Sequence, residues 1–223
     1  MFNEQKKLLH VTLQKTNPIS DGEKVYRKLG YKVFFDALSS AYPLFYEKVD
    51  KKEFEKLICE FMNFGAKSVE MWKMPDEFRK FVKKQKKFRS IAFTDELLWF
   101  EWIEMKLMMK NYKAKLTKKF SYKHEYKLSK STVLKKLRNR VFERKSFDTK
   151  GEFFLLGYYD LNEKRVYFIE ISQVMYLFLK ELKKNGSKKA VIKIAVMSEQ
   201  RKNEVKEFFR DSLTDLTKKG IIR

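Results

Sequence analysis

The most apolar long stretch of the chain, Phe93–Lys110, constrains the fold more than any other segment. Its apolar residues recur at helical spacing on nearly every face, which predicts a helix that neighbouring helices surround. Glu101 and Glu104 sit in its middle, and the stretch is too short and too acidic to cross a bilayer. We therefore expect a central buried helix whose role is core packing, which we favour over a ligand or cofactor box.

The first half of the chain predicts further helices that pack around this central one. Asp50 and Pro75 stand where helices begin, and Gly65 stands where one ends. In the second helix we expect Gly30 to cost about 1 kcal/mol unless a neighbour packs closely against it. The expected core face of that helix consists of Tyr26, Leu29, Val33 and Ala37, with Phe34 and Leu38 beside it. The predicted helices are Asn3–Lys15, Glu23–Ala41, Lys51–Phe64 and Asp76–Gln85.

Residues 111–130 are polar, rich in lysine and weakly periodic, which indicates a domain boundary. We predict a helical domain at 1–112, a basic linker at 113–130 and a C-terminal α+β domain at 131–223. The last should contain a β-hairpin, because two segments rich in Phe, Tyr, Ile and Val flank a polar turn. Its predicted elements are a short helix at Ser131–Arg140, strands at Glu152–Tyr159 and Lys164–Ile171, and helices at Gln173–Lys184, Lys188–Met197 and Ser198–Lys219.

The predicted fold class is therefore mainly α with a small α+β part. An N-terminal helical bundle is followed by a C-terminal domain with a β-hairpin and about three helices.

The chain carries a formal charge of +22, from 51 Lys and Arg against 29 Asp and Glu. Residues 105–150 contribute +13 of it, with 16 basic and 3 acidic residues, and the run Arg79–Arg89 has no acid. Such runs attract phosphate backbones, but lysine exceeds arginine throughout, so a compositional bias explains them equally well. The candidate nucleic-acid contacts are Arg79, Lys80, Lys83, Lys84, Lys86, Lys87, Arg89, Lys118, Lys119, Lys123, Lys135, Lys136, Arg138 and Arg140.

Two further features bear on how a nucleic acid could be bound. Phe120, Tyr122 and Tyr126 interleave the second group of cations, where they suit either the stacking of bases from single strands or the docking of the linker onto a core. The turn at Asn185-Gly186 could imitate a helix-turn-helix. However, the helix Lys188–Met197 is mostly apolar and lacks Arg, Asn and Gln, so we expect it to be buried and to read no base edges.

Residues that carry catalysis or bind metals are scarce. Cys59 is the single cysteine, which excludes an intrachain disulfide and a CxxC zinc site. His10 and His124 fall in different predicted domains, and no HxxxH, HExxH or glycine-rich phosphate loop occurs. We therefore expect no enzymatic activity, no cofactor and no metal. The N-terminus lacks the apolar core of a signal peptide, so we expect a cytoplasmic protein without a membrane partner.

Several segments within about residues 20–110 are similar to the bacterial "putative DNA-binding domain" family of helical proteins. They are Val25-Tyr26-Arg27, Ala37-Leu38, Ala41-Tyr42-Pro43, Phe54 with Leu57, Asp76–Val82 and Leu97–Trp102. Tyr42 stands where that family usually has Phe. The C-terminal half resembles the α+β domain of its two-domain members. The resemblance implies DNA binding. It also implies a second reading, because some relatives are non-catalytic partners of the iron enzymes that mature methanobactin- and bufferin-type peptides.

Together these observations predict a non-enzymatic cytoplasmic binding protein. We expect a nucleic acid as its partner, bound non-specifically through the backbone; the alternative is a peptide- or protein-binding accessory subunit of a peptide-maturation enzyme. The resemblance also places Arg27 on the helix that packs against the central one. Because an isolated buried carboxylate is costly, it implies a structural ion pair between Arg27 and Glu101. Alternatively, both side chains face solvent separately.

Overall fold

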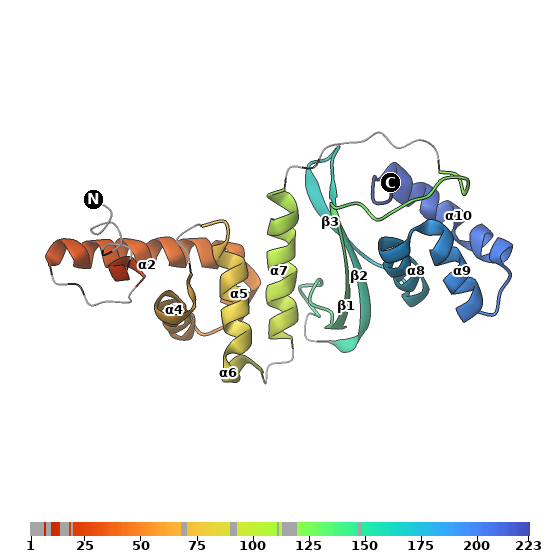
Figure 1. The fold of residues 1–223 in the computed structure, drawn as a ribbon. Helices are drawn as coiled ribbons and strands as arrows, with labels where there is room; N and C mark the ends of the chain where they lie inside the picture. The colour runs from red at the N-terminus through yellow and green to blue at the C-terminus, as the bar shows by residue number, and fades with distance from the viewer. Residues whose placement is uncertain are drawn as a thin grey trace. The chain divides into compact units, whose positions relative to one another are not determined.

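The computed structural model describes residues 7, 10–13, 18, 20–67, 71–89, 93–110, 112, 120–146 and 149–223. The chain divides into two compact units, residues 1–103 and residues 104–223. The first unit is helical and the second combines helices with a sheet (Figure 1), which confirms the predicted fold class. The first predicted helix, Asn3–Lys15, falls largely outside the described residues. Among the described helices, none is long and apolar enough to span a bilayer.

The first unit is a bundle of helices around an aromatic core. Asp50 accepts hydrogen bonds from the first backbone amides of α4, and a proline opens α5, as the sequence predicts. The largest fully buried rings are Tyr42, Phe45, Phe54, Phe61 and Phe78. The elements are α2 (Asp21–Ala41), α3 (Pro43–Lys48), α4 (Lys51–Glu60), the π-helical turn η1 (Phe61–Gly65), α5 (Met74–Lys84), α6 (Lys86–Arg89) and α7 (Thr94–Met108), which continues into the second unit.

Helix α2 buries a different face from the predicted one. Phe34 and Leu38 are buried, and a Cβ atom at Gly30 would lie 2.5 Å from the Thr12 Cγ2 atom, so this glycine has the close neighbour that justifies it. Both sides of α2 carry apolar residues at helical spacing, so the spacing alone could not choose between them. Three residues predicted to face the core are instead exposed: Tyr26, Leu29 and Val33.

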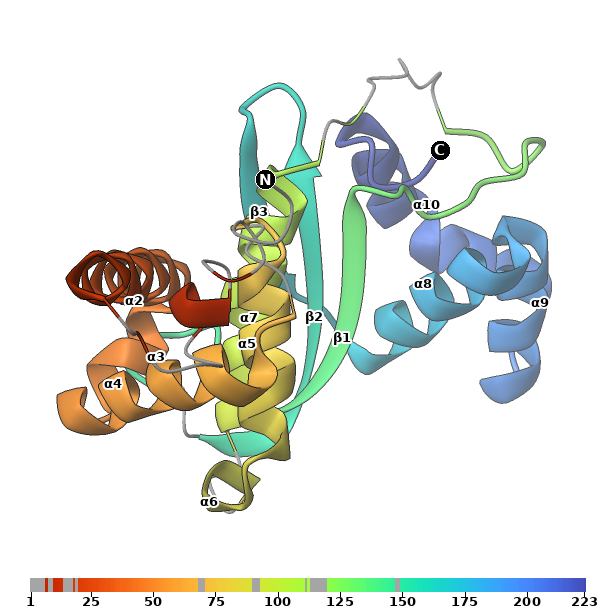
Figure 2. The ribbon, with the colours of Figure 1, turned by 60° about the vertical axis from the view of Figure 1, so that its left-hand side comes forward.

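The second unit combines a three-stranded antiparallel sheet with three helices on one of its sides (Figure 2). The strand order is β1-β2-β3, and the middle strand is buried from Phe153 to Tyr158, which means that both of its faces are covered. Leu156 and Tyr158 share one core with the three helices. The elements are β1 (Thr132–Asn139), β2 (Lys150–Asp160), β3 (Arg165–Glu170), α8 (Gln173–Asn185), α9 (Ser187–Met197) and α10 (Lys202–Lys218).

The hairpin and helices α8 and α9 are confirmed, but two other predictions for this unit are wrong. Ser131–Arg140, predicted as a helix, forms strand β1, which pairs along its length with β2. Leu134 and Leu137 stand three residues apart, a spacing that suits a helix, and the pairing with a buried strand overrides it. The last helix begins at Lys202, because Ser198 ends α9 instead of starting a new helix.

The described part of the predicted linker, residues 120–130, belongs to the second unit. The Lys127 amide donates to the Arg223 carbonyl and the Ser129 amide to the Ile221 carbonyl, each at 2.8 Å. The segment therefore runs beside the end of the chain and contributes residues to the core of this unit. It looks like a linker in the sequence because its exposed lysines outnumber its buried aromatic residues.

Candidate nucleic-acid interface

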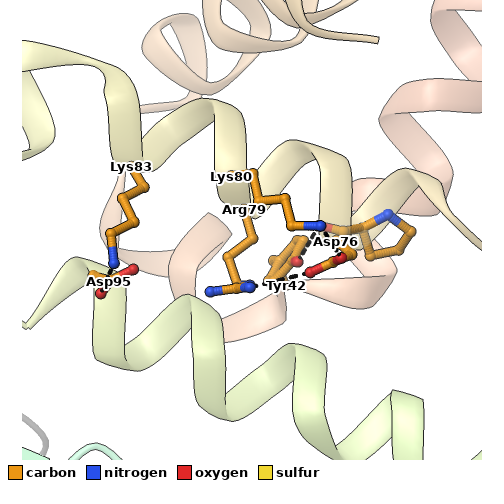
Figure 3. Close-up of polar contacts among 7 residues, drawn as sticks. Tyr42, Asp76, Arg79, Lys80, Lys83 and Asp95 are labelled. Carbon is orange, nitrogen blue, oxygen red and sulfur yellow. Dashed lines mark hydrogen bonds and ion pairs between the residues drawn. The ribbon is translucent and has the colours of Figure 1, made fainter. Parts of the chain in front are cut away.

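Most cations of the first predicted basic run are paired with carboxylates of the first unit. Figure 3 shows three of these pairs, on α5 and at the start of α7. A phosphate would have to compete with them, so the run offers a partner less charge than the sequence suggests. Lys84 and Lys86 are exposed without a carboxylate partner in the described part of the chain, which does not include the Arg89 side chain. The pairs are Arg79–Asp76 at 3.1 Å, Lys80–Asp76 at 2.6 Å, Lys83–Asp95 at 2.9 Å, and Lys87–Glu53.

Arg79 is built into the helical bundle. Its side chain is 16% exposed, and its guanidinium lies 4.6 Å from the centroid of the Trp102 ring. Burial raises the pKa of the Asp76 carboxyl, but hydrogen bonds from Lys80 and Arg79 outweigh burial and leave the pKa below its usual value. Burial also raises the pKa of the nearby Tyr42 well above its usual value. Arg79 is thus a structural residue and a poor phosphate contact.

The second predicted group of cations is also largely engaged. Lys135 and Arg138 have interaction partners, and Lys118 and Lys119 lie outside the described residues. Within the described chain, Lys123 is the member of this group that is exposed and has no carboxylate partner. The ion pairs of the group are Arg140–Glu143 and Arg140–Glu170, each at 3.2 Å, and Lys136–Glu152.

A different set of lysines gathers where α8 meets α9. Gly186 alone joins the two helices, with a φ of 87° that favours glycine. The segment 122–126 packs against this turn: the Ser187 amide donates to the Tyr126 carbonyl at 3.1 Å, and the Tyr126 amide donates to the Ser187 Oγ atom at 3.0 Å. The lysine corner is the name we give to the exposed lysines in the last turn of α8, in the first turn of α9 and in segment 122–126: Lys123, Lys183, Lys184, Lys188 and Lys189.

The carboxylates of this region already have other partners. Glu125 accepts a hydrogen bond from the Lys188 amide at 3.2 Å and thereby caps α9. Glu181 binds Lys193 at 2.7 Å and also accepts from Asn185, and these hydrogen bonds lower the pKa of its carboxyl. Lys184 lies close enough to Glu181 to help lower the pKa of that carboxyl, but no ammonium group of the lysine corner forms an ion pair with a carboxylate of the described residues.

The helix dipole favours two of the four helical lysines of the corner and disfavours the other two. Lys183 and Lys184 lie in the last turn of α8, where the helix dipole favours cations. Lys188 and Lys189 lie in the first turn of α9, which contains no acidic residue, and cations there cost about 0.3–1 kcal/mol. Glu125 offsets that cost from outside the helix. An anionic partner would explain why the sequence keeps two lysines at this unfavourable position.

Helix α9 is half exposed, so the prediction that it is buried is wrong for its outer face. It packs inward through Ala190, Val191, Ile194 and Ala195. Its outer side chains cannot make the bidentate contacts to base edges that Arg, Asn and Gln make, so the face can hold a backbone without reading sequence. The exposed residues are Lys188, Lys189, Ile192, Lys193, Val196 and Met197.

The three aromatic residues between the predicted cations dock their segment onto the core. The ring centroid of Phe120 lies 4.9 Å from that of Tyr122 and 5.0 Å from that of Tyr126. The Tyr122 hydroxyl donates to the Lys206 carbonyl of α10, and burial raises the pKa of Tyr122 to about 12. The docking alternative therefore describes these rings, and they are not free to stack on bases.

Glu101 is buried, and it caps a helix that the sequence did not predict. Its Oε1 atom accepts from the Leu44 amide at 2.6 Å and its Oε2 atom accepts from the Phe45 amide at 3.2 Å, in the first turn of α3. Arg27 lies 14 positions before the end of α2, or about 21 Å at 1.5 Å per residue. Its Nε atom donates to the Val11 carbonyl at 3.4 Å. In these contacts Arg27 and Glu101 bind different backbone groups, and the ion pair between them stays a prediction.

The described residues contain no group of three His, Cys, Asp or Glu side chains that could hold a metal ion. Cys59 is a free thiol of intermediate exposure. His10 and His124 are both exposed and belong to different units.

No family model matches this chain, and no curated protein matches it either. The interpretation of its function therefore depends on its own residues and contacts. Of the lysine corner, the sequence singled out Lys123 alone. The signal that could have found the other four is their position on both sides of Asn185-Gly186, where two lysines precede the turn and two follow it.

Proposed function

We propose that this protein is a non-enzymatic binding protein that holds the sugar–phosphate backbone of a nucleic acid on the lysine corner. The observation that carries the proposal is the meeting of exposed lysines from three segments, without carboxylate partners among the described residues. Lysines neutralise phosphates as point charges and release counterions, which gives affinity that does not depend on sequence. The cations of residues 20–110 are largely paired and add little to this interface, so the proposal depends on the lysine corner alone.

The salt dependence of binding follows from the number of phosphates that the lysine corner neutralises. If its five lysines each contact one phosphate, the logarithm of the association constant falls against the logarithm of salt concentration with a slope of about −4.5 on duplex DNA. On a single strand the slope is about −3.5. A fourfold rise in salt would then weaken duplex binding about 500-fold.

Two variants that each lose four charges test the proposal. The corner variant has its substitutions in the lysine corner, and the control has them at lysines that form ion pairs. Binding of each to a labelled 20-base-pair duplex is followed by fluorescence anisotropy at several salt concentrations. The corner variant should reduce the steepness of the slope by about 3.6, and the control by less than about 1, because its lysines already have carboxylate partners. Equal changes in the two variants would show that only net charge matters and would refute the proposed interface. The corner variant is Lys183→Gln, Lys184→Gln, Lys188→Gln and Lys189→Gln; the control is Lys80→Gln, Lys83→Gln, Lys87→Gln and Lys136→Gln.

One observation favours the alternative of a peptide or protein partner. The outer face of α2 presents four apolar side chains that are each 44–58% exposed: Val25, Tyr26, Leu29 and Val33. Such a stripe suits an amphipathic helix as partner. An amphipathic leucine-rich peptide should then bind with little dependence on salt and should lose affinity when Leu29 and Val33 are both changed to Ser. Binding that is unchanged by this double substitution would remove the alternative.

A further inference from the structure

A hollow of about 510 Å³ lies at the end of α7, beside the turn that joins β2 to β3. All its described lining residues belong to the second unit. Its volume falls in the range of small-molecule sites, about 300–1,000 Å³, and is large enough for one nucleotide. The lining residues are Met108, Met109, Lys110, Tyr112, Tyr159, Leu161 and Lys164.

Two tyrosine rings form one wall of the hollow. The ring centroids of Tyr112 and Tyr159 lie 5.6 Å apart with an angle of 36° between their planes, and both residues are partly exposed. Met108 and Met109 stand beside them, each 54% exposed. Flat rings next to polarizable thioethers make a surface on which another planar ring can stack.

The Tyr112 hydroxyl is a hydrogen-bond donor without an acceptor. Its oxygen is buried from solvent and has no hydrogen-bond partner among the described residues. Burial raises the pKa of Tyr112, so this hydroxyl keeps its proton at neutral pH. A buried polar group without a partner costs about 1–3 kcal/mol, and a ligand with an acceptor atom would remove that cost once a small side-chain movement uncovers the hydroxyl oxygen.

The charged side chains of the hollow are cationic. Lys110 and Lys164 are exposed and have no carboxylate partner among the described residues. The acids of the adjacent turn are engaged elsewhere: Asp160 accepts from two backbone amides of the turn, and Glu163 binds the Tyr167 hydroxyl and Arg165. At the rim, therefore, no ion pair within the described residues competes with an anion for Lys110 and Lys164.

From these features we propose that the hollow holds a nucleobase, which stacks on the tyrosine rings and accepts a hydrogen bond from the Tyr112 hydroxyl, while Lys110 and Lys164 bind its phosphate. The proposal deepens the proposed function and rests on it, because it gives the bound strand a base contact apart from the lysine corner. Only an unpaired base can enter such a site, so the hollow selects single strands or free nucleotides over a duplex.

The first experiment measures nucleotide binding to the full chain by isothermal titration calorimetry. AMP should bind, and ribose 5-phosphate, which carries the phosphate without a base, should bind at least tenfold more weakly. Tyr112→Phe should weaken AMP binding about tenfold without lowering the melting temperature, because the lost hydroxyl has no internal acceptor. The matched control, Tyr122→Phe, removes a hydroxyl that donates to the Lys206 carbonyl, so it should lower the melting temperature and leave AMP binding unchanged. Equal binding of AMP and ribose 5-phosphate, or a loss of stability in Tyr112→Phe, would overturn the proposed base site.

The second experiment separates this site from the lysine corner. Heparin is a polyanion without bases, whereas a deoxyadenosine decamer has both charges and bases. Tyr159→Leu should weaken binding of the decamer at least fivefold and leave heparin binding unchanged. The corner variant should weaken both ligands. A Tyr159→Leu protein that loses neither the decamer nor AMP would refute the base site, whereas a corner variant that keeps both polyanions would refute only the proposed backbone interface. If Tyr159→Leu affects the decamer while AMP binds too weakly to measure, the base of a strand is the ligand and the free nucleotide is not.

Discussion

Removal of the Glu101 carboxylate should destabilise the first unit by about 3 kcal/mol. In Glu101→Ala, two amides in the first turn of α3 lose their acceptors, and both hydrogen bonds are at least partly buried. Each unsatisfied buried donor costs about 1–3 kcal/mol, and the missing side chain leaves a cavity in addition. Glu101→Gln should cost about 1.5 kcal/mol, because its single carbonyl oxygen can satisfy one of the two amides.

The three tryptophans make this effect measurable in one unit alone. Trp72, Trp99 and Trp102 all lie within residues 1–103. Their fluorescence during urea unfolding therefore reports the first unit. With a slope of about 1.5 kcal/mol per molar urea, Glu101→Ala should lower the midpoint by about 2 M. The exposed Glu55 of α4, which lies in the same unit, provides the control, since Glu55→Ala should change the stability by less than about 0.5 kcal/mol.

A double-mutant cycle separates the cap from the ion pair that the sequence implied. The effects of Arg27→Met and Glu101→Gln should add within about 0.5 kcal/mol, because the two side chains bind different backbone groups. A coupling energy above about 1 kcal/mol would restore the ion pair. A cost below about 1 kcal/mol for Glu101→Ala would refute the capping role.

Three further results are expected. Because the folded-state pKa of Asp76 is lowered, its carboxylate contributes stability above its unfolded-state pKa, and this contribution is lost as the pH falls through the folded-state pKa. The difference in unfolding free energy between the protein and Asp76→Asn should thus be present at pH 7 and vanish in acid. A difference that does not depend on pH would contradict this. Gly186→Ala should lower the stability of the second unit by at least about 1 kcal/mol, since φ is positive at this residue and a Cβ atom would collide with the Glu125 carboxylate. Thermal unfolding followed by circular dichroism measures this, and an unchanged melting temperature would contradict the turn geometry. A fragment 120–223 should melt at a higher temperature than a fragment 131–223, because the longer one keeps the strand-like contacts with the end of the chain; equal melting temperatures would restore the linker prediction.

Short sequence patterns predicted those helix ends and turns that are formed by residues close together in the chain. Asp50 caps a helix where the sequence predicts, because a side-chain oxygen meets free amides within one turn. The hairpin was predictable for the same reason, since two β-rich segments flank a short polar turn.

Elements that depend on distant partners were predicted less well. Strand β1 forms because β2 pairs with it, and the sequence of Ser131–Arg140 alone does not predict that pairing. Helix α3 begins directly after α2, where the sequence predicts no helix, and its cap comes from Glu101, 57 residues away from Leu44 in the sequence. Both cases concern groups that meet only after the chain has folded.

The same reasoning explains why charge density alone overstates how much unpaired charge the predicted basic run carries. In the run Arg79–Arg89 the sequence shows no acid, yet the fold brings Glu53 to Lys87 and Asp95 to Lys83. A run of cations within one helix is therefore a place where distant carboxylates can gather, and its net field falls as they do. In the lysine corner Glu181 binds Lys193 and Glu125 caps α9, so neither forms an ion pair with a lysine of the corner, although the charge of Glu125 still lowers the local positive field. For a partner that binds by counterion release, the number of unpaired cations at one place sets the affinity, and that number becomes visible only when every carboxylate has been assigned.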